Sequence, residues 1–201
     1  QTRRIGQQDM ESFIRNYRAA KNEPPYVGIV HRLDQPVEGV MVFAKNQKAA
    51  ASLSRQIKEH TTEKYYRAAS RGQGVSGAAV EDEEAWHTLT DYISFDKRTN
   101  TSKITSEKDR LAKKAVLQYR VISVTPDRDS SQNECIRTEF DIKLLTGRHH
   151  QIRLQLANIG YPLIGDTKYG GDTAREQLAL CSYKIVFDHP ATGERMTFEL
   201  P

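Results

Sequence analysis

Residues 136–144 alternate between two kinds of side chain, and this pattern constrains the fold more than any other feature of the chain. One set is formed by Ile136, Thr138, Phe140, Ile142 and Leu144, and the polar set between them by Arg137, Glu139, Asp141 and Lys143. Because successive side chains of a strand point to opposite faces, the pattern predicts a half-buried antiparallel strand. Thr146-Gly147 ends it, and Ile152, Leu156 and Ile159 then follow helical spacing up to Gly160, a C-terminal cap.

Shorter patterns define the other expected elements. Asp9 is placed to cap a helix over 10–20, which Asn22-Glu-Pro-Pro25 stops, and Asn46 caps a second helix with Ala49, Leu53 and Ile57 on one face. Strands are expected over 26–30, over 65–69 and, buried on both faces, over 40–44; a hairpin is expected over 178–188 and 196–200, and an exposed loop over 70–84. Strands mostly in antiparallel order with a few helices define an α+β fold.

Length and composition narrow the class of protein. A chain of 201 residues predicts one domain, and no stretch approaches the roughly 18 apolar residues of a membrane helix, so we expect a soluble globular protein. Cys135 and Cys181 lie in no CxxC motif, which favours a reduced, intracellular and specifically cytoplasmic setting. The formal charge is +4, and residues 97–120 carry eight basic and two acidic side chains. That stretch either contacts a nucleic-acid backbone or keeps a long surface loop solvated.

A polar tetrapeptide, His31-Arg32-Leu33-Asp34, lies between two apolar segments in a loop that runs to Gly39. Functional residues concentrate in loops at strand ends, so this loop is a candidate site. The plainer interpretation is a local ion pair between Arg32 and Asp34. Both interpretations stay open on these residues alone.

A second candidate segment is Gly147-Arg148-His149-His150-Gln151-Ile152-Arg153. It opens the expected helix, where backbone N–H groups and two arginines favour anions. Arg153 borders the buried helix face, so it either pairs with a carboxylate or extends its head to solvent. His149 and His150, as helix neighbours, would point about 100° apart, and no third ligand is spaced nearby, so no metal site is expected.

A third segment, Lys64-Tyr65-Tyr66-Arg67-Ala68, places two tyrosines on opposite faces of a strand. One ring is then buried in the core and the other faces a cleft. A tyrosine, an aspartate and an arginine in one cleft would form a pocket able to stack a flat base.

Together these segments resemble the RluA family of pseudouridine synthases. The resemblance rests on His31-Arg-Leu-Asp34 with Gly39, on Lys64-x-Tyr66-x-Ala68, on Thr146-Gly-Arg-x-His-Gln-Ile-Arg153, on Gly160-x-Pro162-x-x-Gly165-Asp166-x-x-Tyr169-Gly170 and on His189-Pro190. Order and spacing match over about residues 26–201. The chain departs from the pattern at Glu38, where Ser is common, and at His149, where Thr is usual.

The resemblance implies a mixed, mainly antiparallel, bent sheet flanked by helices, with a catalytic cleft between its two halves. We therefore expect residues 1–201 to form a single catalytic domain without the family's first strands and without an S4-type RNA-binding domain.

The resemblance also implies isomerisation of uridine to pseudouridine in structured ribosomal or transfer RNA, without metal or cofactor, by a monomer that binds no membrane. Asp34 is then the catalytic carboxylate. Arg153 pairs with Asp34 and lowers its pKa, which offsets the effect of burial. Tyr66 stacks on the flipped base and acts in a later proton transfer. His31, Arg32, Lys64 and Arg148 are the expected RNA-binding residues.

Two rival classes remain. One is a noncatalytic RNA-binding protein of the same fold, and the other is a metal-dependent hydrolase using His31, His149 and His150. The sequence does not identify the RNA or the uridine that is modified.

Overall fold

The computed structural model describes residues 9–71, 85–129, 132–170 and 176–201. Their elements, in chain order, are α1 (Met10–Ala20), β1 (Gly28–Ile29), β2 (Glu38–Gly39), β3 (Phe43–Ala44), α2 (Gln47–Lys58), β4 (Glu63–Ser70), β5 (His87–Asp96), β6 (Thr101–Thr105), β7 (Lys113–Arg128), β8 (Glu134–Leu144), α3 (Gln151–Asn158), β9 (Leu180–Asp188) and β10 (Arg195–Glu199). The expected α+β class is confirmed.

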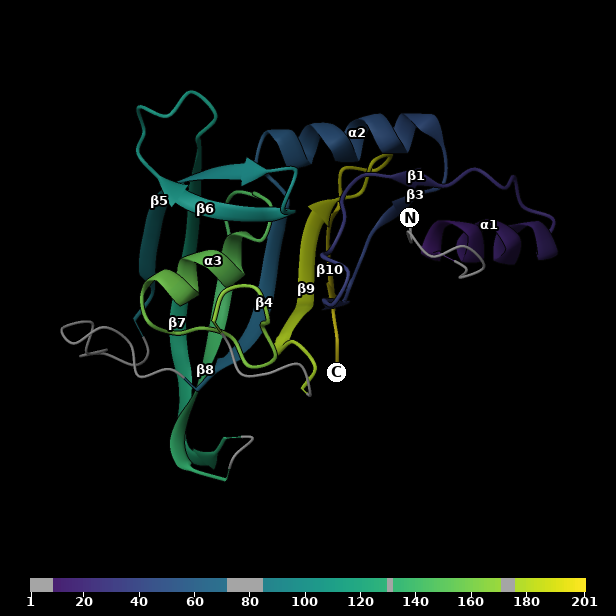
Figure 1. The fold of residues 1–201 in the computed structure, drawn as a ribbon. Coiled ribbons are helices and arrows are strands. Elements are labelled where there is room, and N and C mark those ends of the chain that lie inside the picture. The colour runs from purple at the N-terminus through teal and green to yellow at the C-terminus, as the bar shows by residue number, and fades with distance from the viewer. Residues whose placement is uncertain (1–8, 72–84, 130–131, 171–175) are drawn as a thin grey trace. The chain divides into compact units, whose positions relative to one another are not determined.

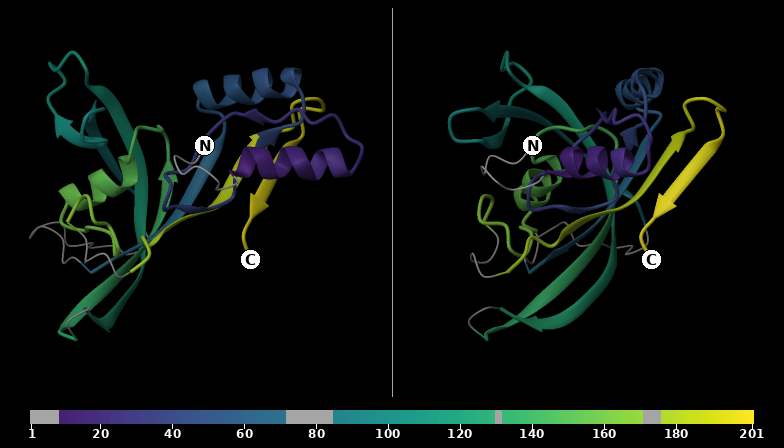
Figure 2. Two further views of the ribbon diagram at one scale, coloured as in Figure 1. Left: turned by 45° about the vertical axis from the view of Figure 1, so that its right-hand side comes forward. Right: turned by 90° about the vertical axis from the view of Figure 1, so that its right-hand side faces the viewer.

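The large sheet is mainly antiparallel, as expected. Its hydrogen-bonded neighbours follow the order β10-β9-β4-β8-β7-β5-β6, and β2 pairs with β9 in parallel (Figure 1). The pairs β4–β8, β7–β8, β5–β7 and β5–β6 are all antiparallel. The β7–β8 hairpin extends past the strands beside it (Figure 2).

The chain divides into two compact units. The first contains Gln1–Arg32, Met41–Thr62 and Val186–Thr197, and the second contains Leu33–Val40, Glu63–Ile185 and Phe198–Pro201. In the first unit, β1 and β3 form a two-stranded antiparallel pair. The second unit holds most of the large sheet, together with α3.

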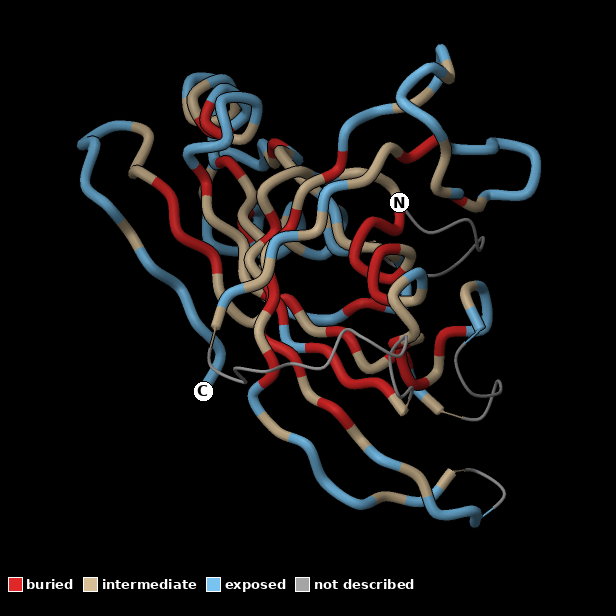
Figure 3. Tube along the Cα trace, turned by 90° about the vertical axis from the view of Figure 1, so that its left-hand side faces the viewer, coloured by how far each residue is buried: buried red, intermediate tan, exposed pale blue. Residues whose placement is uncertain are grey.

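The core of the second unit lies on one face of β4, β7 and β8, against α3 (Figures 1 and 3). The alternation of β8 is confirmed: Thr138, Phe140, Ile142 and Leu144 are buried, whereas Ile136, near the exposed end of the hairpin, is 45% exposed. The exception on the other face is Asp141, which is 3% exposed. Arg120 and the Tyr183 hydroxyl bond to its carboxylate at 3.0 and 2.9 Å, so this charge is buried with partners.

Both N-terminal helices of the first unit form as the sequence predicts. The Asp9 and Asn46 side chains accept hydrogen bonds from the backbone of Ser12 and Ala49, respectively. The apolar stripe of α1 nevertheless stays exposed, with Met10, Phe13 and Tyr17 each more than half accessible.

The prediction of a buried strand over 40–44 was wrong in both its length and its burial. Regular pairing covers only Phe43–Ala44 in that range, and residues 40–43 are half-buried rather than buried on both faces. The strand expected over 26–30 is likewise reduced to Gly28–Ile29. Among the described residues, β1 and β3 form a two-stranded sheet with two paired residues in each strand.

The basic stretch 97–120 is not one long loop. It contains the β5–β6 turn, all of β6 and the first half of β7. The C-terminal hairpin of β9 and β10 is confirmed, whereas residues 72–84 of the expected loop lie outside the described part of the chain. No helix among the described residues has the length and apolar character needed to span a membrane.

Candidate active site

Asp34 lies in a tight turn that is fastened to β9. Its carbonyl accepts the Val37 N–H at 2.9 Å, and β2 then pairs with Cys181 and Ser182. Gly39 has a φ of +131°, and a Cβ there would lie 2.2 Å from the Ser182 carbonyl oxygen. Only glycine allows this close approach, so the glycine of the motif positions the Asp34 turn.

Arg153 projects from α3 and is 4% exposed. Its Nε and Nη2 donate to the two carboxylate oxygens of Asp166 at 2.8 and 2.7 Å. Burial alone raises the pKa of Asp166, but hydrogen bonds from Arg153 and from the Lys168 backbone lower it below its ordinary value. Asp166 and Arg153 therefore form a buried, charged and geometrically fixed pair.

Asp34 approaches the free edge of the same guanidinium. Arg153 Nη1 lies 3.7 Å from Asp34 Oδ2, and the Asp34 side chain is 28% exposed. The expected pairing of Asp34 with Arg153 is thus a longer contact, and the closer partner of Arg153 is Asp166.

The prediction that Arg153 offsets the effect of burial on the Asp34 pKa was wrong. Burial raises it, and the charges of Arg153 and His149 only partly oppose that effect, so the pKa lies above its ordinary value. Because the guanidinium of Arg153 lies closer to Asp166 than to Asp34, it offsets only part of the effect of burial on the Asp34 pKa.

His150 adjoins Asp34 from the other side, with Nε2 3.7 Å from Oδ2. Its Nδ1 is hydrogen-bonded to the Tyr169 hydroxyl at 2.8 Å, and that hydroxyl also accepts the Ser102 N–H at 2.9 Å. Burial, with nearby Arg153 next in importance, lowers the pKa of His150 to about 3, so the imidazole is neutral at pH 7.

The two histidines do not diverge as expected. His150 precedes α3 in a left-handed conformation with a φ of 53°, and its ring packs on His149 with 3.7 Å between centroids and 34° between ring planes. The expectation of a 100° separation was wrong because α3 begins only at Gln151. No group of three His, Cys, Asp or Glu side chains that could hold a metal ion occurs among the described residues.

The two tyrosines of β4 do occupy opposite faces. Tyr66 is 7% exposed within the core, and Tyr65 is only half-buried. Burial raises the pKa of Tyr66 to about 12, a hydrogen bond with Ser182 opposes the rise, and the charge of Asp34 adds to it. The Tyr66 hydroxyl is therefore protonated at neutral pH and lies within electrostatic range of Asp34.

The residues expected to bind RNA are dispersed. Lys64 lies beside Gly147, and burial lowers its pKa. Arg148 donates from Nε to the Lys114 carbonyl at 2.9 Å, which turns this side chain toward β7. In the first unit, His31 Nε2 accepts the Val42 N–H at 3.0 Å, and Arg32 is exposed.

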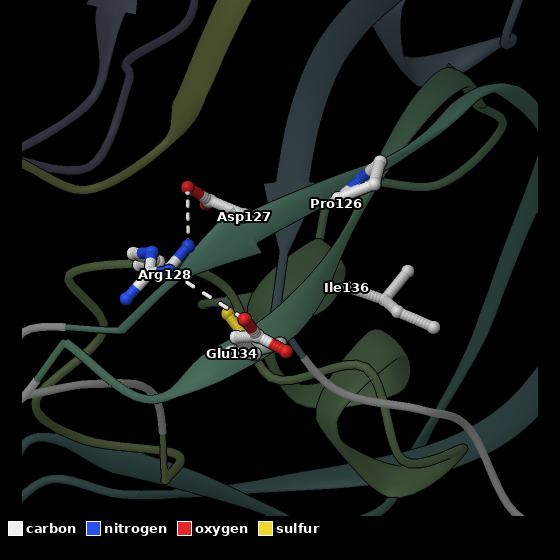
Figure 4. A pocket seen from close by; sticks show the side chains of 6 residues that line it. Pro126, Asp127, Arg128, Glu134 and Ile136 are labelled. Atoms are coloured by element: carbon white, nitrogen blue, oxygen red, sulfur yellow. Dashed lines mark hydrogen bonds and ion pairs between the residues drawn. The ribbon is translucent and has the colours of Figure 1, made fainter.

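A pocket of the second unit adjoins Asp34 along the chain. Its lining comprises residues 35–38, Arg153, Gly165, Thr167 and residues 176–178. Another pocket lies between the ends of β7 and β8, lined by Pro126, Asp127, Arg128, Glu134, Cys135 and Ile136 (Figure 4). None of the predicted site residues lines this second pocket.

Three residues of this arrangement were not assigned roles from the sequence: Asp166, Tyr169 and Ser102. Asp166 and Tyr169 stand in the Gly165-Asp166-x-x-Tyr169-Gly170 motif, and the need of Arg153 for a carboxylate partner was the available signal for Asp166. Ser102 follows no motif, and only its tertiary contacts with His149 and Tyr169 show its role.

Comparison with known proteins shows the family of the chain. Residues 2–158 match the family model described as RNA pseudouridylate synthase. The chain belongs to that family.

The relatives are longer than the chain. Ribosomal large subunit pseudouridine synthase D of Pseudomonas aeruginosa is 33% identical over 192 residues, covering 88% of this chain and 53% of that protein. An uncharacterized RNA pseudouridine synthase of Aquifex aeolicus is 34% identical over 183 residues, covering 86% of this chain and 52% of that protein. The chain therefore spans about half the length of these relatives.

Among solved structures, human RNA pseudouridylate synthase domain containing 1 aligns with a TM-score of 0.70 at 24% identity. The alignment covers 88% of this chain and 69% of that one. The shared fold is that of pseudouridylate synthase domains.

Proposed function

We propose that the chain converts uridine to pseudouridine in RNA, with Asp34 as the catalytic carboxylate. The observation that carries the proposal is the asymmetric use of Arg153, which bonds Asp166 at 2.7 and 2.8 Å but faces the partly exposed Asp34 at 3.7 Å. One carboxylate holds the guanidinium, and the other is left free to react.

The chemistry is an isomerisation, so atoms balance within the nucleotide. The N1–C1′ bond breaks, a C5–C1′ bond forms, and the proton lost from C5 is replaced by a proton at N1. The uridine has to leave its stack to reach a protein carboxylate. Asp34 attacks or deprotonates the ribose while the uracil departs, and Arg153 stabilises the charge that moves.

Tyr66 supports the base rather than acting as an anion. Its raised pKa of about 12 keeps the hydroxyl protonated, so the group can donate a proton or a hydrogen bond but does not serve as a ready base at neutral pH. The proposed stacking of uracil on Tyr66 uses the part of the residue, 7%, that is left exposed by the core.

Structured RNA of the large ribosomal subunit is the proposed substrate, by analogy with the relatives, and transfer RNA is the second candidate. His31, Arg32, Lys64 and Arg148 are proposed to contact this RNA. We propose further that residues 1–201 act as one catalytic domain and as a monomer in the cytoplasm.

The test is tritium release from RNA labelled with [5-³H]uridine, followed by analysis of the digested nucleosides. The wild-type chain should release tritium and form pseudouridine in equal amounts, and Glu59→Gln, which removes an exposed carboxylate at the end of α2, should behave as wild type. RNA binding without tritium release would instead identify the noncatalytic RNA-binding class.

A further inference from the structure

A column of three rings leads outward from Asp34 in the second unit. His150 packs on His149 with 3.7 Å between centroids and 34° between ring planes, and His149 packs on Phe95 with 4.1 Å and 41°. The inner end of the column contacts Asp34, and the outer end, Phe95, is 39% exposed. The column therefore connects the candidate site to the surface.

The middle ring is held from β6. Ser102 Oγ donates to the His149 carbonyl at 2.9 Å and lies 3.0 Å from His149 Nδ1. Because the single hydroxyl proton is used by the carbonyl, Oγ accepts from a protonated Nδ1. Ser102 also pairs in register with Phe95, so both side chains lie on the same face of the β5–β6 hairpin. The His149 ring, against which Phe95 packs, is thus held by β6.

The surroundings of Phe95 suit a polyanion. The adjoining turn carries the exposed Lys97 and Arg98, and its acid, Asp96, accepts the Arg98 backbone N–H at 2.8 Å. Lys168 Nζ donates to the Asn100 carbonyl at 2.6 Å, which adds a cation from the Asp166 motif to this turn. Exposed aromatic rings flanked by cations are the usual platform for unpaired nucleotides.

We infer that Phe95 accepts a nucleobase of the substrate RNA next to the uridine that enters the site, with Lys97 and Arg98 on its phosphates. When the uridine flips out of its stack, the adjacent bases lose a stacking partner. The exposed Phe95 ring offers one of these bases a replacement surface. The inference rests on the proposed function and deepens it by assigning a second RNA subsite.

The direct test places a fluorescent ring at the platform. Trp86 is the only tryptophan of the chain, so Trp86→Phe combined with Phe95→Trp reports from position 95 alone. The matched control combines Trp86→Phe with Phe198→Trp, since Phe198 is similarly exposed at 43% and belongs to β10, at the opposite end of the strand order from β6. The probe is a transcript of the large ribosomal subunit RNA.

Stacking predicts strong quenching at position 95 and little at position 198 when the transcript binds. Quenching at both positions alike, binding without quenching at 95, or no binding at all would overturn the inference. The result does not require turnover, so it is distinguishable from failure of the proposed function, which tritium release by the wild type tests.

Kinetics give the second readout. Phe95→Leu keeps an apolar side chain but removes the ring, and it should raise KM at least about fivefold, the lower limit for losing one base–aromatic stack, with kcat retained. Phe95→Tyr should restore KM, and Phe198→Leu should leave it unchanged. A lowered kcat with unchanged KM for Phe95→Leu would mean that the ring only supports the site, which contradicts the inference.

Discussion

The two carboxylates beside Arg153 are held in opposite ways. Asp166 is 1% exposed and is bonded by the guanidinium and by two backbone N–H groups. Asp34 is 28% exposed, and its contacts with Arg153 and His150 are each 3.7 Å long. Their pKa values shift accordingly, downward for Asp166 and upward for Asp34. The comparison teaches that a buried arginine can be neutralised by one acid so that a second acid beside it stays loosely bound.

The largest expected effect is the loss of stability when Asp166, the acid that holds Arg153, is replaced. Asp166→Asn leaves Arg153 as a buried charge without its counterion, so the free energy of unfolding at pH 7 should fall by about 3–5 kcal/mol. Since the pKa of Asp166 is lowered by folding, its contribution is present above the unfolded-state pKa and is lost as pH falls through the folded-state pKa. Urea denaturation over a pH series measures both.

The control for this variant is Asp188→Asn in the exposed pair of Asp188 with Arg195, 3.1 Å apart. It should cost less than about 1 kcal/mol. Equal losses in the free energy of unfolding for the two variants would show that the buried Asp166–Arg153 pair stabilises the fold no more than an exposed pair does.

The next largest effect is expected when the Tyr169 hydroxyl, which links His150 to β6, is removed. Tyr169→Phe leaves the Ser102 N–H and the His150 Nδ1 without their partner and should lower the free energy of unfolding by about 1–3 kcal/mol. It should also reduce kcat, because His150 loses the bond that orients it beside Asp34. Thermal unfolding and tritium release measure the two effects.

Tyr92→Phe is the matched control, since the Tyr92 hydroxyl bonds only to the side chain of Glu107 at the surface among the contacts described. Its effect on the free energy of unfolding should be much smaller than that of Tyr169→Phe, because the Tyr92 hydroxyl is exposed. If Tyr169→Phe were equally silent, the network of Ser102, Tyr169 and His150 would have no part in holding the site.

A smaller effect on the free energy of unfolding, of opposite sign, is expected for substitution of Asp34. Burial raises the pKa of Asp34, so its ionised form destabilises the folded state, and Asp34→Asn should increase the free energy of unfolding at pH 7. Wild type and variant should converge below the unfolded-state pKa, and the wild type should lose stability relative to the variant as pH rises through the folded-state pKa. A less stable Asn variant at pH 7 would mean that the carboxylate is held in place rather than left free.

The smallest expected effect is a displacement of the pH profile. If ionised Asp34 is the active form, kcat/KM should fall on acidification with a midpoint above the ordinary aspartate pKa of about 3.9. Lys168 lowers the pKa of Asp34 by its charge, so Lys168→Met should move the midpoint further upward. Lys108→Met, on an exposed turn, is the control, and an unmoved midpoint in Lys168→Met would remove Asp34 as the titrating group.

Much of the fold followed from local sequence patterns. The helix caps at Asp9 and Asn46 and the alternation in β8 are set by residues a few positions apart, so they could be predicted. The exposed stripe of α1 and the short pairing of residues 40–44 could not, because burial depends on what packs against a segment rather than on its own periodicity.

The candidate site shows the same division. The motifs brought Asp34, Tyr66 and Arg153 into one unit as expected, with their roles still proposals. The preference of Arg153 for Asp166, the upward pKa shift of Asp34 and the stacked histidines all depend on distances of a few tenths of an ångström and on burial. No spacing within the sequence encodes those quantities.

The central claim is that Asp34 reacts while Asp166 holds Arg153 in place. It is tested most directly by tritium release from [5-³H]uridine-labelled RNA with Asp34→Asn, measured beside RNA affinity on the same preparation. The account predicts RNA affinity close to wild type, because binding comes from distributed phosphate and base contacts, and no detectable turnover. Turnover of the Asn variant at a rate near that of wild type would contradict it.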